Sequence, residues 1–364
     1  MNRAEIYQQR LLPLLERFDP EAVHCRTLDL LRLLETDPLT LKLVEKLGCR
    51  DGRRYQHPLL STRVAGLELE NPLLVAAGFD KDALAPRALI ELGFSSVEIG
   101  TVTLHPQAGN DKPRLWRLPD NSLLNALGFP SAGAAAVRQN LSRCWPRTFP
   151  LGVSLGINKT THHEEAASDM ATLAYLLDDY ADYFVLNISS PNTPFLRTLH
   201  TSPFLAQMVV EIRYLIADAQ KPLLLKISPD LSPAELNVVM RFALDNQISG
   251  IIATNTSLDY SLNPQTVAAY TSGGISGQSL QALSTSVLRH LYRESGGALD
   301  LIGSGGVNSL ESLLDKFFAG AKAVSIYTGL VSVGPTLPTA LNEQLVDWLY
   351  HHQTTLDGII GQDK

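Results

Sequence analysis

The segment Leu73-Leu-Val-Ala-Ala-Gly-Phe-Asp-Lys81 joins a short apolar run to a glycine and two charged residues. Seven further runs of this kind follow, each separated from the next by a stretch with helical character. The eight runs are residues 73–77, 96–100, 151–155, 183–188, 223–227, 250–254, 301–303 and 323–327. Near-continuous apolar strands that alternate with helices are typical of a parallel sheet buried on both faces. Eight such units over about 270 residues predict an α/β fold, a (β/α)8 TIM barrel.

A doubly wound sheet is the alternative arrangement of alternating strands and helices. Its glycine fingerprint, G-x-G-x-x-G, is absent, and without a Gly-Lys dipeptide the chain holds no P-loop. Residues 62–72, just before the first run, have the pattern of a small β-hairpin.

Residues 4–48 form a separate region with helical periodicity, so we place a domain boundary between 1–55 and 56–364. Pro20 and Pro38 divide the region into short helices, and each follows an aspartate (Asp19, Asp37) suited to an N-cap. The apolar side chains of these helices cover more than one face. Two interpretations stay open, a helical hairpin packed on the main domain and a surface element that lies in a membrane interface.

Composition narrows the class of protein. Apolar residues make up 45% of the chain and charged residues 18%, which indicates a globular fold with a sizeable core. The net charge of −7 argues against broad nucleic-acid binding, because that binding needs clustered positive charge. The three cysteines, Cys25, Cys49 and Cys144, are too few and too scattered for a disulfide framework, which favours a reducing compartment. No stretch has the length and apolarity of a transmembrane helix or a signal peptide.

Active sites of barrels lie at the C-terminal ends of the strands, so the residues after each run belong together. They include two lysines, several carboxamides and hydroxyls, and glycines after the last two strands, but a single carboxylate, Asp80. Metal-dependent hydrolysis and paired-carboxylate glycosidase chemistry both lack the side chains they need. The neighbours His162 and His163 cannot converge on one ion, so we expect no metal site.

The strand ends fit a ligand with a phosphate and a ring rich in amide groups. Barrels often bind phosphate through backbone N–H groups after strands 7 and 8, here Gly305, Gly306, Thr328 and Gly329. Lys226 ends a buried strand, where it can hold an anion or stabilise negative charge on a cofactor ring. Four asparagines offer paired donors and acceptors that suit a pyrimidine-like ring. They are Asn125, Asn187, Asn192 and Asn255.

Taken in order, the motifs resemble those of the dihydroorotate dehydrogenases, specifically the membrane-associated, quinone-reducing class 2. The resemblance spans nearly the whole chain. It rests on Asp19-Pro-Glu21, Ala76-Ala-Gly-Phe-Asp-Lys-Asp82, Glu98-Ile-Gly-Thr-Val-Thr103, Gly109-Asn-Asp-Lys-Pro-Arg-Leu-Trp-Arg117, Asn125-Ala-Leu-Gly-Phe129, Asn187-Ile-Ser-Ser-Pro-Asn-Thr-Pro194, Ala253-Thr-Asn-Thr256, Gly273-Gly-Ile-Ser-Gly277 and Ile326-Tyr-Thr-Gly329.

The resemblance implies oxidation of (S)-dihydroorotate to orotate, a step of pyrimidine biosynthesis, with FMN as hydride acceptor and a membrane quinone as final acceptor. FMN contacts are expected from Ala77, Gly78, Phe79, Asp80, Lys81, Thr101, Ser154, Asn187, Lys226, Thr254, Gly277, Gly306, Tyr327 and Thr328. The substrate contacts implied are Lys81, Asn125, Ala126, Leu127, Gly128, Phe129, Asn187, Asn192, Asn255 and Thr256.

The catalytic group implied by the resemblance is Ser190, as base, with Lys81, Thr193 and Phe129. Class 1 relatives use cysteine at the Ser190 position, and none of the three cysteines lies near it. Because a serine hydroxyl is weakly basic, we expect Thr193 and a water to relay its proton while Phe129 excludes solvent. The chain departs from the family pattern at Ser154, usually asparagine, at Phe195, usually glycine, and at Ala126, where relatives often have a larger residue.

The class 2 resemblance gives the two predicted regions their roles. By this resemblance, residues 1–55 are expected to associate with the membrane and to form a tunnel through which quinone enters, and residues 56–364 are expected to form the FMN-binding barrel. The residues expected to line the tunnel are His24, Arg117 and Tyr327. It implies a monomer associated peripherally with the lipid bilayer, on the cytoplasmic face of a bacterial inner membrane, that binds no nucleic acid.

The sequence disfavours two rival functions. A dihydrouridine synthase acting on RNA would carry a basic surface and a cysteine acid, and the negative charge and Ser190 oppose it. A catalytically silent, membrane-docked barrel would not need Lys81, Ser190 and the asparagines, all of which are present.

Overall fold

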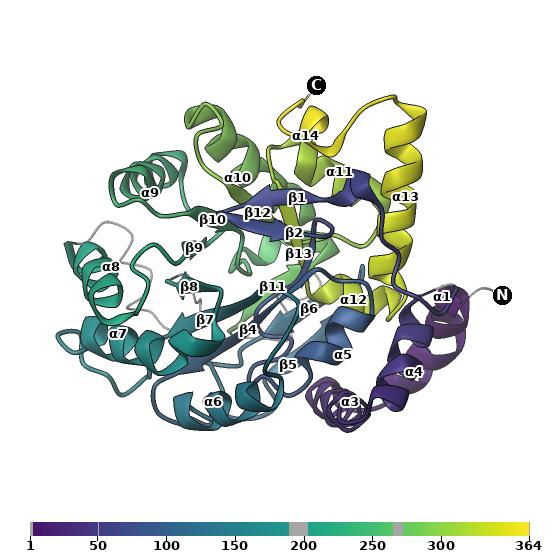
Figure 1. Ribbon diagram of the computed structural model, residues 1–364, viewed down its shortest axis with the longest axis horizontal. Helices are drawn as coiled ribbons and strands as arrows, with labels where there is room; N and C mark the ends of the chain where they lie inside the picture. Colours follow the sequence, from purple (N-terminus) through teal and green to yellow (C-terminus); the bar gives the residue numbers. More distant parts are fainter. Residues whose placement is uncertain (1–2, 50, 189–202, 265–271, 364) are drawn as a thin grey trace.

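A closed parallel barrel forms the centre of the computed structural model, which describes residues 3–49, 51–188, 203–264 and 272–363 (Figure 1). Around the barrel the strands follow the order β10-β12-β13-β3-β4-β7-β8-β9. Their bounds are β3 (Leu73–Val75), β4 (Ser96–Thr103), β7 (Leu151–Gly156), β8 (Tyr183–Asn187), β9 (Leu223–Ile227), β10 (Gly250–Ala253), β12 (Leu301–Ser304) and β13 (Ala323–Ile326). Each lies on one of the eight predicted runs, so the TIM-barrel prediction is confirmed.

Alternate residues of these strands bury two different surfaces, which is why the runs are apolar throughout. Leu73 and Val75 of β3 belong to the larger core between sheet and helices. Leu74 belongs to a second core inside the barrel. The predicted hairpin, β1 (Thr62–Val64) and β2 (Leu67–Leu69), is present and contributes its apolar side to this inner core. It therefore closes one end of the barrel.

Helices surround the barrel on its outside (Figure 1). They are α5 (Pro86–Glu91), α6 (Ala134–Arg143), α7 (Ala166–Leu177), α8 (Pro203–Leu215), α9 (Pro233–Asp245), α10 (Gln281–Glu294), α11 (Leu310–Phe318), α12 (Thr328–Val333), α13 (Leu337–His351) and α14 (Leu356–Ile359). Ser309 begins α11 with a reciprocal capping box to Ser312, which satisfies N–H groups of its first turn.

The N-terminal region is helical, as predicted. It contains α1 (Arg3–Ile6), a π-helical turn η1 (Tyr7–Leu11), α2 (Leu12–Leu15), α3 (Pro20–Leu34) and α4 (Pro38–Gly48). Asp19 and Asp37 are the N-caps of α3 and α4, accepting hydrogen bonds from backbone N–H groups of the first turns. The π-helical turn was not expected.

Hydrogen bonds and an ion pair hold the N-terminal helices against the barrel. Tyr7 donates its hydroxyl to the Val331 carbonyl at 2.7 Å, and Glu21 of α3 forms a buried ion pair with Arg114 at 2.8 Å. Arg117 donates to the Phe18 carbonyl at 2.8 Å. Figure 1 shows α3 and α4 beside α5 at one side of the barrel.

Many apolar side chains of the N-terminal helices point away from the protein. Nine of the 17 large apolar residues that are exposed in the described part of the chain lie before residue 50. They are Ile6, Leu11, Leu14, Phe18, Leu30, Leu33, Leu39, Leu43 and Leu47. No described helix has the length and apolarity to cross a bilayer.

A three-stranded antiparallel sheet, which the sequence analysis did not predict, lies beside the barrel mouth. It consists of β5 (Leu115–Leu118), β6 (Ser122–Asn125) and β11 (Gly274–Gly277) in the order β11-β6-β5. Asn125 pairs in register with Leu115 on one side and Gly274 on the other. The sheet thus brings two distant segments of the chain to the same place.

Candidate active site

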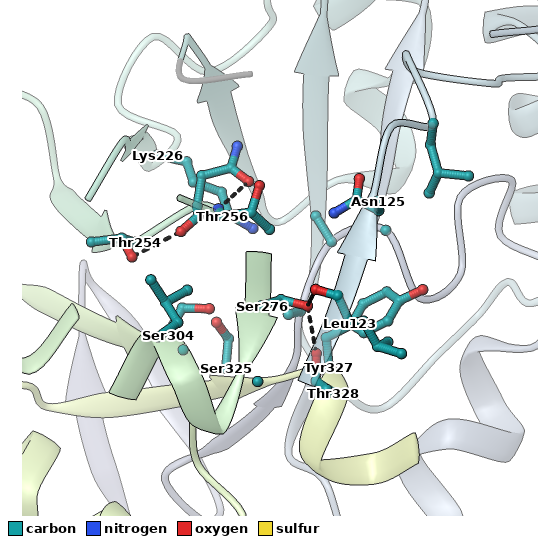
Figure 2. Close-up of a pocket in the computed structure, with 18 of the residues that line it drawn as sticks. Leu123, Asn125, Lys226, Thr254, Thr256, Ser276, Ser304, Ser325, Tyr327 and Thr328 are labelled. Carbon is teal, nitrogen blue, oxygen red and sulfur yellow. Dashed lines mark hydrogen bonds between the residues drawn. The ribbon is translucent and has the colours of Figure 1, made fainter. Parts of the chain in front are cut away.

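A cavity opens where the C-terminal ends of the barrel strands meet β6 and β11 (Figure 2). Most of the predicted site residues line it. They are Ala77, Gly78, Lys81, Thr101, Asn125, Leu127, Gly128, Phe129, Asn187, Lys226, Thr254, Asn255, Thr256, Gly277, Gly306, Tyr327 and Thr328. The four predicted phosphate donors, Gly305, Gly306, Thr328 and Gly329, line the same cavity. The strand-end rule therefore predicted most of the described residues that gather around this cavity.

Lys226 brings a buried positive charge to the cavity floor. Its Nζ lies 3.9 Å from Oε1 of Glu98, a carboxylate that is 1% exposed as a residue. Burial raises the pKa of Glu98, and the charge of Lys226 opposes that rise. Within the described residues, neither oxygen of Glu98 has a hydrogen-bond partner. The pair therefore interacts by charge alone, and of the two residues Lys226 lines the cavity.

The asparagines are held in one orientation by a chain of hydrogen bonds. Asn187 donates through Nδ2 to Oγ1 of Thr101 at 2.8 Å. Asn255 donates through Nδ2 to Oδ1 of Asn187 at 3.2 Å and accepts from the backbone N–H of Thr256 at 2.8 Å. Both residues sit at strand ends, so β8 and β10 fix their positions. The resulting donor and acceptor pattern matches a ring that carries amide groups.

Lys81 lies on the opposite side of the cavity, in the loop after β3. Its Nζ donates to the Gly78 carbonyl at 2.8 Å. Burial lowers the pKa of this lysine, while nearby carboxylates, Asp82 first among them, raise it. The two lysines and the asparagines together form a polar site that attracts negative charge.

An aromatic cluster connects this side of the cavity to the N-terminal helices. The ring of His24, on α3, packs edge-on against Phe79 at 5.1 Å between centroids and stacks on Tyr327 at 6.2 Å. Burial, with the charge of Lys81, lowers the pKa of His24 to about 3, so the ring is neutral at physiological pH. Its Nε2 is buried without a hydrogen-bond partner among the described residues. Tyr327 faces the cavity as well, so it is shared by the two regions.

Hydroxyl groups gather where the last strands end. Ser276 and Thr328 share a hydrogen bond of 2.9 Å between their hydroxyls, drawn as a dashed line in Figure 2. Ser325 Oγ is buried and has no partner within the described part of the chain. Gly306, with φ of +80°, adopts a backbone conformation that favours glycine. These residues leave donors for a ligand at this end of the cavity.

Six of the predicted residues that the structure describes do not line the cavity. The Asp80 carboxylate is fully buried and accepts from the N–H groups of Leu84 and Ala85, so it shapes the loop that carries Lys81. Ser154 is buried and shares a hydrogen bond of 3.0 Å with Thr101. The other four are Phe79, Ala126, His24 and Arg117. Phe79 and His24 pack against each other, and Arg117 binds the Phe18 carbonyl.

Ser190, Asn192, Thr193 and Phe195 lie outside the described residues, and their assigned roles stay predictions. Several lining residues escaped the sequence analysis. Leu115, Leu123 and Ser276 come from the unpredicted sheet, and Ser304 and Ser325 are the serines at or next to the end of a barrel strand. Of these five, only Ser304 and Ser325 could have been predicted from the sequence, because they fall directly after or within the predicted runs.

Comparison with known proteins identifies the family. A family profile described as Dihydroorotate dehydrogenase matches residues 59–349. The chain belongs to the dihydroorotate dehydrogenase family. The resemblance seen in its motifs is thereby confirmed.

Curated members of the dihydroorotate dehydrogenase family match almost end to end. A protein of Synechococcus sp. (strain JA-3-3Ab) named Dihydroorotate dehydrogenase (quinone) is 42% identical over 351 residues, 91% of this chain and 90% of its own. A protein of the same name from Chloroflexus aurantiacus (strain ATCC 29366 / DSM 635 / J-10-fl) is 38% identical, covering 95% and 98%.

Solved structures of the dihydroorotate dehydrogenase family share the fold. The ligand-free DHODH from Eimeria tenella superposes with a TM-score of 0.78 at 32% identity, over 90% of this chain and 99% of that one. The same enzyme in complex with ferulenol gives 0.78 at 31% identity, over 90% and 96%.

Proposed function

We propose that this chain oxidises dihydroorotate to orotate and passes the electrons to a membrane quinone, with FMN as its cofactor. The observation that carries the proposal is the cavity itself. It brings Lys81, Lys226, Asn187 and Asn255 together with the glycines after β12 and β13. The relatives named above supply the reaction and the acceptor.

The residues of the cavity fit FMN. Ser325 Oγ, buried and unpartnered within the described chain, is available to hydrogen-bond a ligand. The N–H groups of Gly306 and Thr328 suit a phosphate, and Lys226 suits a ring that gains negative charge. Bound FMN supplies the hydride acceptor for the substrate and the electron donor for the quinone.

The polar residues opposite bind and orient the substrate. Asn187 and Asn255 present amide groups whose directions are fixed by Thr101 and Thr256, so little entropy is lost when they bind a ring of matching pattern. Asn125, on β6, donates to the Gly274 carbonyl at 3.3 Å and completes this side of the site. The Lys81 ammonium attracts the carboxylate of dihydroorotate and fixes its position.

Proton removal is assigned to Ser190. Oxidation takes a hydride from C6 and a proton from C5 of the substrate, and Ser190 accepts that proton with Thr193 and a water as the relay. Phe129 shields the site from bulk water. Its backbone, at φ of +53°, lies in the left-handed region, and Gln107 holds it there by donating to the Phe129 carbonyl at 2.8 Å.

Quinone is proposed to reach the cavity between the N-terminal helices. His24 and Tyr327 form a neutral aromatic wall from α3 to the cavity, which suits an uncharged quinone ring. Arg117 holds the chain before α3 through carbonyls of Leu15 and Phe18, and so keeps the entrance in place. In this role residues 1–55 act as the access segment and residues 56–364 as the flavin-binding barrel.

The same helices are proposed to rest on a lipid bilayer at the cytoplasmic face of the membrane. Their outward leucines give an apolar surface that water disfavours and lipid accepts. The ends of the helices carry arginines that suit anionic headgroups. The chain binds lipid peripherally in this proposal, as a monomer.

An anaerobic titration tests the function. Purified protein should be yellow, lose its flavin absorbance on addition of dihydroorotate, and regain it on addition of ubiquinone or menaquinone but not of fumarate or NAD. A colourless protein, or a yellow one that dihydroorotate does not bleach, contradicts the proposal.

A further inference from the structure

Lys316 is a buried lysine outside the proposed catalytic group. It lies on α11 with none of its surface exposed to solvent. Its Nζ donates to three oxygens of α10, the hydroxyls of Ser284 at 2.5 Å and Thr285 at 2.8 Å and the carbonyl of Gln281 at 3.3 Å. A charged amine is therefore enclosed between two helices.

No carboxylate of the described chain lies within ion-pair distance of this ammonium. The facing charged groups are Asp315 on α11, whose carboxylate accepts from the Gln281 side chain at 2.6 Å, and Arg289 on α10, which pairs with Asp363. Burial lowers the pKa of Lys316 to about 7, with Asp315 raising it and Arg289 lowering it. A buried ammonium without a paired charge costs free energy, so an anion close to it would favour its protonated form.

The fold itself does not depend on the Lys316 charge. The Thr285 hydroxyl also donates to the Gln281 carbonyl at 2.8 Å, and the Ser284 hydroxyl reaches that carbonyl at 3.1 Å. Both hydroxyls would keep an acceptor if the ammonium were replaced by an apolar side chain. Replacement would leave no buried donor unsatisfied.

Ser284 connects this charge to the phosphate end of the cavity. Its hydroxyl donates to the Gly305 carbonyl at 3.2 Å. Its oxygen accepts from Lys316, and Gln281 O also receives Lys316 and the Thr285 hydroxyl, which leaves the Ser284 hydroxyl able to donate to Gly305. In a planar trans peptide the N–H points opposite to the carbonyl, so Gly306 N–H points away from Ser284. Gly305 and Gly306 both line the cavity.

We propose that Lys316 is a positioning residue for the cofactor phosphate, acting through Ser284 and the Gly305–Gly306 peptide and placing an unpaired positive charge behind the phosphate-binding loop. The dianionic phosphate then supplies the charge that Lys316 lacks in the protein. The inference rests on the proposed FMN binding and goes beyond it, because it assigns phosphate selectivity to a residue that touches no ligand.

The test compares FMN with riboflavin, which has the same ring but no phosphate. Dissociation constants are measured by flavin fluorescence on the flavin-depleted full-length chain for wild type, Lys316→Met, Ser284→Ala and Lys322→Met. Lys322 is the matched control, because its ammonium pairs with Asp300. Thermal unfolding of each flavin-free protein is recorded as well.

We expect Lys316→Met to weaken FMN binding by about tenfold or more while riboflavin changes by less than about twofold. Ser284→Ala should weaken FMN alone, by a smaller factor, and Lys322→Met should change neither. The melting temperature of flavin-free Lys316→Met should not fall. At pH 8, FMN binding by wild type should take up protons that riboflavin binding does not.

Equal weakening of both flavins in Lys316→Met, or no weakening of either, overturns the proposal. If Lys316→Met does not fold, the test rests on flavin binding by Ser284→Ala and on proton uptake by wild type. The proposal is overturned if neither measurement shows an effect specific to FMN. Wild type that binds neither flavin refutes the proposed function instead, so the two failures are distinguishable.

Discussion

The outward leucines of α4 allow the lipid proposal to be tested quantitatively. Leu39, Leu43 and Leu47 lie at i, i+4 and i+8, so they form one stripe along the helix. Their side chains are 74%, 52% and 55% exposed, and replacing them with alanine changes little inside the protein. Truncating one fully inserted leucine costs about 2 kcal/mol of transfer free energy. Scaled by exposure, the triple variant should lose about 3.6 kcal/mol of membrane binding free energy, an affinity loss of several hundredfold.

Co-sedimentation with phospholipid vesicles measures this loss. The control is Val210→Ala/Tyr214→Ala on α8, because these side chains are 65% and 86% exposed and Figure 1 places α8 on the other side of the barrel from α4. The control should bind vesicles like wild type, and all three proteins should melt at nearly the same temperature. Equal vesicle binding by the triple variant and wild type would refute the reasoning, as would equal losses in triple variant and control.

Three further outcomes are expected. Ser190→Ala should slow flavin reduction by dihydroorotate by about 10²–10⁴-fold in stopped-flow measurements, and an unchanged rate would remove the base assignment. Arg114→Met should destabilise the protein by about 3 kcal/mol in chemical denaturation, because it leaves the carboxylate of Glu21 buried without its main partner; no destabilisation would mean that the ion pair is dispensable. Burial raises the pKa of Glu35 from 4.5 to about 7, although its carboxylate accepts from Ala88 N–H. Between about pH 4.5 and pH 7 the folded chain keeps a proton that the unfolded chain releases. The free energy of unfolding that this group contributes therefore falls as the pH rises through that range. Glu35→Gln should flatten this fall between pH 5 and pH 8, and an identical pH profile in the variant would contradict the assignment.

Features that repeat along the chain could be predicted from the sequence. Each barrel strand buries both faces, so every run is apolar and ends at the same edge, which located Lys226 and Asn187 without a structure. The aspartate-proline pairs before α3 and α4 carry a local signal, because an N-cap depends on the residues directly beside it. Apolar runs and N-caps can be recognised from neighbouring residues, without knowledge of distant contacts.

Long-range pairing produced the features that were missed. β5 and β6 pair with each other, but the third strand of their sheet, β11, comes about 150 residues later in the chain. No local periodicity indicates that distant partner. Lys316 gave no signal either, since a lysine in an amphipathic helix normally points to solvent. Only the packing of α11 against α10 shows that its amine is enclosed.

The N-terminal helices are held on the barrel while their outward leucines remain exposed, and this affects how the purified protein behaves. Hydrogen bonds, an ion pair and inward apolar side chains such as Leu28 and Val44 hold these helices on the barrel. The outward leucines are not needed for that attachment, so they stay exposed in the fully native protein. Aggregates that form in detergent-free buffer would then consist of intact, folded molecules, and a mild detergent would return them to solution in their native state.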